Sequence, residues 1–209
     1  MGIEIRGLRE DEFGVHDELI YESYKEYDRE GHEDRWWSHI ATHDPYYEPE
    51  QTRVMLVDGE MVASVSNYLR EMYCAGRHAK ISAIGNVATR PNHRRKGYVR
   101  QVLAESRQWM LDSGFDFSFL FGDQDVYGSS GWEMFSAFNA MVKARVPKED
   151  LGLTVRQAQF PDDVATLASV YASFNEPFTG PFVRSEAYWE TRASVGYFRD
   201  NKTGRMQVS

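Results

Sequence analysis

The segment from residue 80 to residue 114 constrains the fold of this chain more than any other. Its first ten residues are typical of a strand. One face of that strand is predicted to carry Ile81, Ala83, Gly85, Val87 and Thr89. A basic turn follows, and then a helix that Gly114 ends. The apolar stripe of this helix is predicted to consist of Val99, Val102, Leu103, Ser106 and Met110. A strand, a tight turn and a helix in direct succession predict a crossover within an α/β sheet.

The residues before this segment add strands and helices of their own. Residues 4–8 are typical of a strand, and a helix follows with a stripe at Val15, Leu19, Ile20 and Tyr24. A second helical segment includes Trp36 and Trp37 and stops before Pro45. Residues 53–57 and 61–65 flank Asp58-Gly59-Glu60, which is a strong hairpin signal.

Residues 115–121 form an apolar run short enough to be a buried strand. The order of elements is therefore strand, helices, three strands, helix, strand. This order predicts a mixed α/β domain with a mixed sheet, in which the central helix connects two neighbouring parallel strands.

The composition excludes several functional classes. Acidic residues outnumber basic ones by 32 to 24, for a formal charge of −8, which argues against nucleic-acid binding. The sequence has no apolar run long enough to span a membrane and no secretory leader at its start. Its one cysteine, Cys74, fits a reducing, cytoplasmic setting. His39 and His43 have no third ligand at a suitable spacing, so we predict no metal site.

The basic turn, Arg94-Arg95-Lys96-Gly97, is the segment that points to chemistry. It lies where a strand ends and a helix begins, and the first amides of a helix have no partners within the helix. Such amides hold a diphosphate, and a glycine lets the chain approach it closely. The alternative is a solvated basic turn. The glycine patterns of Rossmann and Walker nucleotide sites do not occur in the sequence.

This segment resembles the cofactor motif of the GNAT superfamily of acetyl-CoA-dependent N-acetyltransferases. The motif positions are matched by Val87, Thr89, Pro91, Arg94 and Gly97. Val99 stands where glycine or alanine is usual, and the run from His93 to Val99 looks most like the enhanced-intracellular-survival branch. The resemblance implies a GNAT-like fold with acetyl-CoA as cofactor. It also implies that the cofactor contacts Val87, Thr89, Arg94, Arg95, Lys96, Gly97, Tyr98 and Val99.

A second matching element lies between Gly122 and Trp132, with Tyr127 in its middle. In relatives, the tyrosine at this place protonates the departing thiolate of coenzyme A, so the resemblance makes Tyr127 the candidate catalytic acid. A phenol is protonated at neutral pH and can donate to a thiolate. The alternative is a core tyrosine that packs beside Trp132.

The resemblance also implies an acceptor pocket walled by the first helical region, where Tyr24, Trp36 and Trp37 are candidates. Acidic residues surround them, which favours a cationic amine, although such a run is also typical of a solvated face. The same aromatic residues could equally belong to the core. The implied reaction is acetyl transfer to a primary amine by direct attack in a ternary complex. No Asp or Glu lies between Lys80 and Gly97, so the sequence names no general base.

The tail repeats the head at an offset of about 150 residues, because Tyr21, Ser23 and Tyr24 correspond to Tyr171, Ser173 and Phe174. We therefore expect a cofactor-binding domain at 1–148 and an incomplete second copy at 149–209. The second copy lacks the later strands. Its helix is therefore expected to leave an apolar face uncovered, which consists of Val164, Leu167, Val170, Tyr171 and Phe174.

Two other readings of the function remain open at this stage. The chain could be an acyl-CoA-binding sensor or scaffold without turnover, or a piece of a larger two-domain acetyltransferase. The partner under the enzyme hypothesis is a small-molecule or peptide amine. The oligomeric state is open, with a homo-oligomer among the alternatives.

Overall fold

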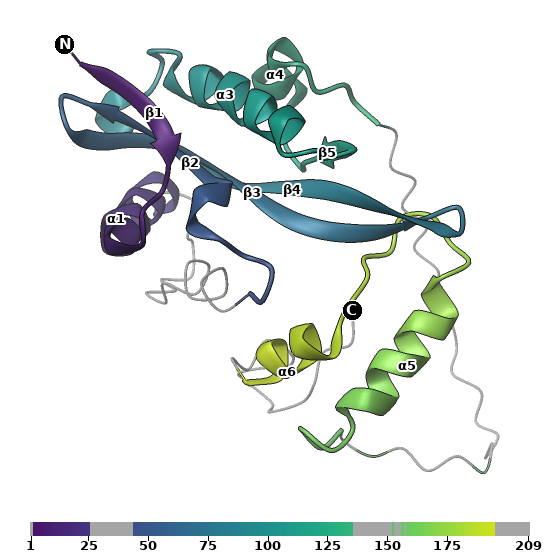
Figure 1. The fold of residues 1–209 in the computed structure, drawn as a ribbon. Helices are drawn as coiled ribbons and strands as arrows, with labels where there is room; N and C mark the ends of the chain where they lie inside the picture. The colour runs from purple at the N-terminus through teal and green to yellow at the C-terminus, as the bar shows by residue number, and fades with distance from the viewer. Residues whose placement is uncertain (1, 26–43, 136–151, 153–155, 157, 195–209) are drawn as a thin grey trace.

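The computed structural model describes residues 2–25, 44–135, 152, 156 and 158–194. Its centre is a five-stranded sheet whose order in space equals its order along the chain (Figure 1). The strands are β1 (Ile3–Gly7), β2 (Thr52–Val57), β3 (Glu60–Cys74), β4 (Arg77–Thr89) and β5 (Phe117–Phe119). The first four pair antiparallel, and β4 pairs with β5 in parallel. The predicted mixed α/β sheet is confirmed.

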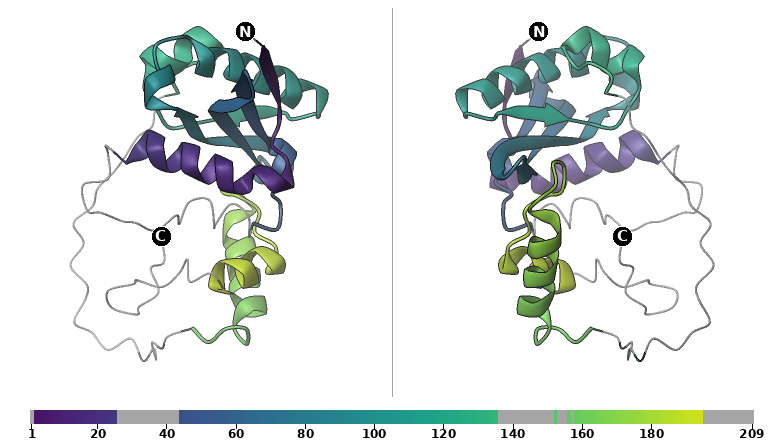
Figure 2. Two further views of the ribbon diagram at one scale, coloured as in Figure 1. Left: turned by 90° about the vertical axis from the view of Figure 1, so that its left-hand side faces the viewer. Right: turned by 90° about the vertical axis from the view of Figure 1, so that its right-hand side faces the viewer.

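Helices cover both faces of this sheet. They are α1 (Phe13–Tyr24), α3 (Tyr98–Asp112), α4 (Gln124–Tyr127), α5 (Val164–Asn175) and α6 (Glu186–Ser194). Figure 2 shows α1 on one face and α3 on the other, and α5 and α6 lie on the same side of the sheet as α1, farther from it. Within the described residues, no helix is long and apolar enough to cross a membrane. The expected helix around Trp36 and Trp37 lies outside the described residues.

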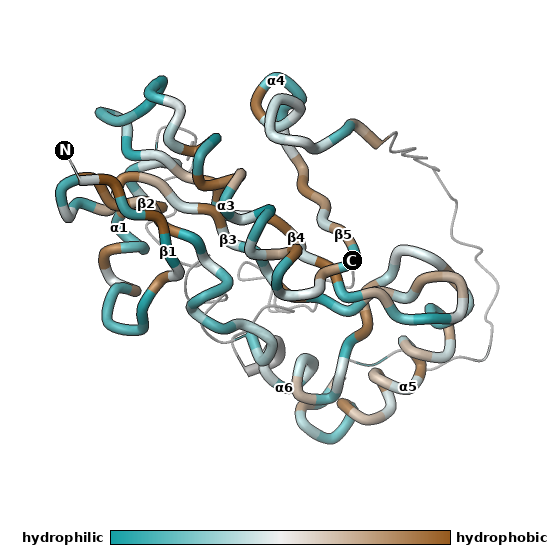
Figure 3. The backbone as a smooth tube through the Cα atoms, turned by 45° about the horizontal axis from the view of Figure 1, so that its top comes forward, coloured by the Kyte–Doolittle hydropathy of each residue, from teal (hydrophilic) through white to brown (hydrophobic). Residues whose placement is uncertain are grey.

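Each helical layer has its own core, because the side chains of a strand alternate between faces. On β2, Val54 packs in the cluster with Leu19 and Ile20 of α1. Its neighbour Met55 packs in the cluster with Leu103 of α3. Hydrophobic residues accordingly run along the middle strands in Figure 3. The sheet thus separates two hydrophobic clusters, one shared with α1 and the other with α3.

The two main helices differ in part from their predicted stripes. In α1 the buried residues are His16, Leu19, Ile20 and Ser23, whereas Val15 and Tyr24 are exposed by 43% and 42%. In α3 the stripe is confirmed from Val102 onward, but at its start Tyr98 is buried and Val99 is only half-buried. The reason is that α3 begins at Tyr98, so this side chain, 6% exposed, fills the first turn of the core.

The predicted hairpin is confirmed, and its second strand is longer than expected. Asp58 and Gly59 both have positive φ, 50° and 87°, as a two-residue turn of the primed type requires. The strand β3 then continues to Cys74, although β2 pairs with it only as far as Ser66. The paired strands β3 and β4 therefore project beyond β2 and β1.

The predicted alternation along β4 agrees with the strand register as far as Gly85 and is wrong beyond it, because the strand then carries a β-bulge. Ser64 and Ser66 of β3 face Ala88 and Gly85 of β4, so β4 has one extra residue in this interval. Asn86 has a left-handed φ of 46° at the bulge. Beyond the bulge the faces are therefore exchanged: Val87 packs against the α3 cluster, as Ile84 does, whereas Ala88 packs in the α1 cluster.

The tail packs on the projecting end of β3. The amide of Tyr73 donates to the carbonyl of Pro181 at 3.0 Å, and the amide of Val183 donates to the carbonyl of Glu71 at 2.8 Å. Between these bonds, the ring of Phe182 stacks on that of Phe119 in β5, with 5.8 Å between centroids. These bonds cover an edge of β3 that β2 leaves unpaired.

The helix α5 of the tail leaves part of its predicted apolar face exposed, whereas Leu167 and Tyr171 are half-buried. Val164 is 4% exposed, but Val170 and Phe174 are exposed by 62% and 69%. The expected opening strand and second strand of the repeat fall largely or wholly outside the described residues. The division into a domain at 1–148 and a partial copy at 149–209 stays a prediction.

Candidate functional site

The basic turn has a backbone that few sequences adopt. A 3-10 turn, Pro91–His93, follows β4, and α3 begins at Tyr98. Between them Arg95 and Gly97 both have left-handed φ, 64° and 75°. Glycine adopts this conformation readily, and alternating conformations of this kind turn successive amides toward one side.

The amides of this turn have no partners within the described protein. None of the backbone N–H groups from Arg95 to Val99 donates a hydrogen bond to a described atom. A Cβ built on Gly97 would meet no atom within 4 Å, so the space before the turn is open. Arg95 and Lys96 are exposed beside it. Unpaired amides at the start of a helix, with two cations beside them, are the features of an anion-binding turn. We call residues 95–99 the amide cradle.

The side chains of Arg94, Tyr98 and Val99 each contact other parts of the protein. The guanidinium of Arg94 donates to the carbonyl of Ser23 near the end of α1 at 2.8 Å, so this side chain ties α1 to the turn. Tyr98 points its ring into the core, and only its amide belongs to the amide cradle. Val99 packs against the same core, so its side chain does not fill the space before Gly97.

One edge of β4 is open beyond its short pairing with β5. The parallel pairing ends where Ala83 faces Phe119, yet β4 continues to Thr89. The amide of Arg90 donates to the carbonyl of Val62 on β3 at 2.9 Å. Because successive residues of a strand point their polar groups to opposite edges, Val87 and Thr89 point theirs away from β3. They therefore line the edge from which β5 has diverged.

The hydroxyl of Tyr24 already occupies part of that edge. It donates to the carbonyl of Val87 at 2.8 Å. This contact places Tyr24 beside the predicted cofactor strand, whereas Trp36 and Trp37, the other residues predicted for the acceptor pocket, lie outside the described residues.

Tyr127 ends α4 and packs partly against the core that α3 shares with the sheet. Burial raises the pKa of its phenol above the ordinary value, so the hydroxyl is protonated at neutral pH. No described residue hydrogen-bonds to this hydroxyl. A Cβ on Gly122 would lie 2.1 Å from Cε2 of Tyr127, so the ring takes the place of a side chain there. Asp123 starts α4 by accepting from the amide of Asp125 at 2.9 Å.

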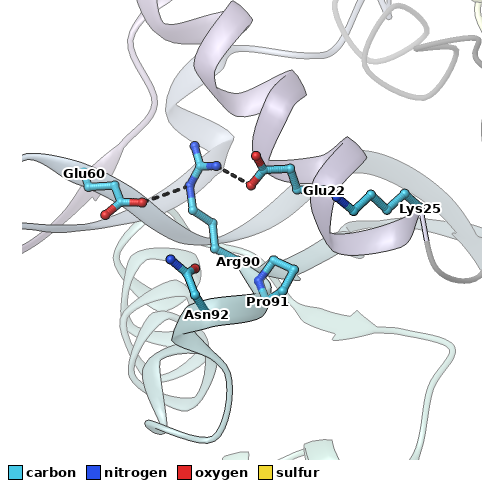
Figure 4. A pocket seen from close by; sticks show the side chains of 6 residues that line it. All are labelled: Glu22, Lys25, Glu60, Arg90, Pro91 and Asn92. Carbon is cyan, nitrogen blue, oxygen red and sulfur yellow. Dashed lines mark hydrogen bonds and ion pairs between the residues drawn. The ribbon is translucent and has the colours of Figure 1, made fainter.

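An ion-pair network that the sequence analysis did not predict borders this region. Arg90 lies between the carboxylates of Glu22 and Glu60, and its Nε donates to the carbonyl of Met61 at 2.8 Å (Figure 4). With Lys25 and Asn92 these residues line an open, polar hollow of about 370 Å³. The sequence signal was too weak to find it, since Arg90 and Glu22 are far apart along the chain. Among the described residues, no group of three or more His, Cys, Asp or Glu is arranged to hold a metal ion.

Comparison with solved structures finds the same fold at low sequence identity. A GCN5-related N-acetyltransferase from Anabaena variabilis has a TM-score of 0.68 and 12% identity, over 90% of this chain and 47% of that one. Eis1 from Mycobacterium abscessus has a TM-score of 0.61 and 13% identity, over 94% and 48%. A GNAT family acetyltransferase from Brucella melitensis, in complex with acetyl-CoA, has a TM-score of 0.52 and 15% identity, over 71% and 94%. The chain thus spans about half the length of the first two.

Sequence comparison identifies the family directly. A search of curated protein sequences gave no match. The family model described as an acetyltransferase (GNAT) domain matches residues 4–135, which include β2 to β5, all of β1 except Ile3, residues 95–99 and Tyr127. The chain therefore belongs to the GNAT acetyltransferase family.

Proposed function

We propose that this chain is an acetyl-CoA-dependent N-acetyltransferase that acts on a primary amine. The observation that carries the proposal is the amide cradle, because five consecutive amides without partners among the described residues need water or an anion as acceptor. The acetyl-CoA in the Brucella melitensis structure, a protein of the same fold, supports this choice of anion.

The cradle and the open edge of β4 fit the two polar parts of acetyl-CoA. The amides from Arg95 to Val99 would hold the diphosphate, with Lys96 adding charge. Val87 and Thr89 would pair with the pantetheine amides along the edge that faces away from β3. A pantetheine amide that pairs with the Val87 carbonyl would share this acceptor with the Tyr24 hydroxyl or displace it, since a carbonyl oxygen has two lone pairs. When bound, acetyl-CoA supplies an activated acetyl group.

The protein's part in the reaction is to polarise and to donate a proton. The N–H of Val87 would polarise the thioester carbonyl. The neutral amine attacks the carbonyl carbon, so that a C–N bond forms and the C–S bond breaks. Tyr127 gives its proton to the sulfur, and the proton lost by the amine restores the phenol through solvent. Glu22 and Glu60 line the hollow beside this region, where Arg90 and Lys25 balance their charge.

All these groups lie within residues 1–148, so we propose one acetyl-CoA site per chain. The tail, 149–209, would contribute packing and no second site. Support comes from the positions of the amide cradle, the β4 edge and Tyr127, all of which precede the tail.

The test combines binding with turnover. Calorimetry with acetyl-CoA should give one site per chain, and a panel of primary amines should then release free thiol. Absence of acetyl-CoA binding would refute the proposal. Binding without thiol release for any amine would instead favour a sensor or scaffold that holds acyl-CoA. Detection of two sites per chain would contradict the proposed division of the chain.

A further inference from the structure

The bulge of β4 lies at the start of the open edge. Pairing with β5 stops at Ala83, and the extra residue falls between Gly85 and Ala88. Bulges redirect the groups of a strand and often lie next to active sites. The conformation of this bulge therefore decides where the amide of Val87 points.

The side chain of Asn86 holds the bulge in a conformation that is rare for most residues. Its φ is 46°, and asparagine is among the few residues that tolerate this region. Its Nδ2 donates to the hydroxyl of Tyr68 at 2.6 Å. The Tyr68 ring also covers the neighbouring residue, since a Cβ on Gly85 would lie 3.0 Å from it. Burial raises the pKa of Tyr68 to about 12, so this partner stays neutral.

The peptide between Asn86 and Val87 is held from the β3 side. Oγ of Ser64 donates to the carbonyl of Asn86 in a long contact of 3.4 Å, and Nε2 of His16 lies 3.2 Å from the same Oγ. In a trans peptide the C=O and the following N–H point in opposite directions. The N–H of Val87 therefore points away from β3, into the opening beside β5. In the described pairings of β4 with β3 and with β5, Val87 has no partner residue.

We infer that Asn86, held by Tyr68, is a positioning residue that aims the N–H of Val87 at the thioester carbonyl. This inference rests on the proposed function. It assigns a task to a residue outside the amide cradle and distant from Tyr127 in the sequence. It also explains why a polar pair, rather than an apolar one, lies across β3 and β4 at this point.

Three variants separate the parts of this arrangement. Tyr68→Phe keeps the ring over Gly85 and removes only the hydroxyl. Asn86→Gly keeps the left-handed backbone and loses the bond to Tyr68. Asn86→Val is incompatible with a positive φ and should abolish the bulge. The matched control is Tyr73→Phe, which removes a hydroxyl from the same strand where no described residue bonds to it.

The first measurement needs no cofactor. The amide resonance of Val87 in a ¹H–¹⁵N spectrum of the free protein should shift in Tyr68→Phe and in Asn86→Gly but not in Tyr73→Phe. The second uses acetyl-CoA labelled with ¹³C at the carbonyl. Polarisation lowers the infrared stretching frequency of that carbonyl. We expect this lowering to be largest in the parent, smaller in Asn86→Gly and smallest in Asn86→Val. The affinity for coenzyme A should stay within about twofold in Tyr68→Phe and Asn86→Gly, while kcat falls by up to about 10²-fold.

The outcomes distinguish the two proposals. A parent protein that binds no acetyl-CoA overturns the proposed function and this inference together. A parent that binds and turns over, with the same carbonyl frequency in Tyr68→Phe and Asn86→Gly as in the parent, overturns the inference alone. An unchanged Val87 resonance in both variants does the same. Should Asn86→Val not fold, the two milder variants still decide the question.

Discussion

Replacing Gly97 by valine tests the amide cradle against a control that the chain itself offers. Gly97 and Gly76 have nearly the same φ, 75° and 77°, and a Cβ built on either meets no atom within 4 Å. Gly97 starts α3 in the cradle, whereas Gly76 lies in the turn between β3 and β4. The two substitutions therefore differ in place but not in local backbone or in local space.

The cost in stability should be similar for both variants. A left-handed conformation costs a residue with a Cβ about 1–2 kcal/mol, and β-branching adds to this. For a chain of this size, each kcal/mol lowers the melting temperature by about 2–4 °C. We therefore expect Gly97→Val and Gly76→Val to melt a few degrees below the parent, by similar amounts.

The cost in affinity should fall on Gly97→Val alone. Its side chain projects into the open space where the diphosphate would lie, so one or more amide contacts are lost. A hydrogen bond to a charged group contributes about 1.5–3 kcal/mol, which corresponds to a loss of about 10- to 100-fold in affinity for acetyl-CoA. Gly76→Val should bind acetyl-CoA like the parent.

Calorimetry with acetyl-CoA, beside thermal unfolding of each free protein, measures both quantities. The reasoning fails if Gly97→Val binds as tightly as Gly76→Val, because the diphosphate then lies elsewhere. It also fails if both variants lose affinity equally, since the loss would follow general destabilisation and not the cradle.

Three further predictions follow from the described contacts. Tyr127→Phe should lower kcat by about 10²–10⁴-fold with the affinity for acetyl-CoA little changed, whereas turnover at the parent rate would make this tyrosine structural. A chain trimmed to residues 1–148 should keep one acetyl-CoA site in calorimetry. It should melt at a lower temperature, because Met72 and Phe119 lose the covering ring of Phe182. Loss of all acetyl-CoA binding would contradict the proposed division of the chain. Burial lowers the pKa of His16 to about 4, from 6.5, so the unfolded chain binds more protons between these values and the free energy of unfolding falls as the pH is lowered. Urea titrations should show a loss of about 2 kcal/mol from pH 7 to pH 5 that His16→Gln removes, and an equal loss in both proteins would assign it to other groups.

Local signals in the sequence were sufficient for the hairpin and for the free amides of residues 95–99. Asp58-Gly59 predicted a two-residue turn because both residues tolerate positive φ. The basic turn and Gly97 predicted free amides because a strand ended and a helix began there. These inferences needed only neighbours within a few residues.

The bulge and the contacts around it depend on partners that sequence alone does not bring together. Regular alternation predicts Val87 on a continuous face, and Asn86 gives no sign of the bulge until Tyr68 of the next strand is placed. Tyr24 reaches Val87 across 63 residues of sequence. The packing of α1 against the strands brings such pairs together. The short-range periodicity of the sequence does not predict that packing.

The strand order has a consequence for the sequence of folding events. Because neighbours in the sheet are neighbours along the chain, β2, β3 and β4 associate through short loops, and contacts of this kind form early. The strand β5 arrives only after α3 has crossed the sheet, and it pairs through three residue pairs. During synthesis from the N-terminus, the meander of β2 to β4 is therefore complete before the opening beside β4 has its second wall. A nascent chain at that point would already have the bulge, whereas β5 forms only from the residues that follow α3.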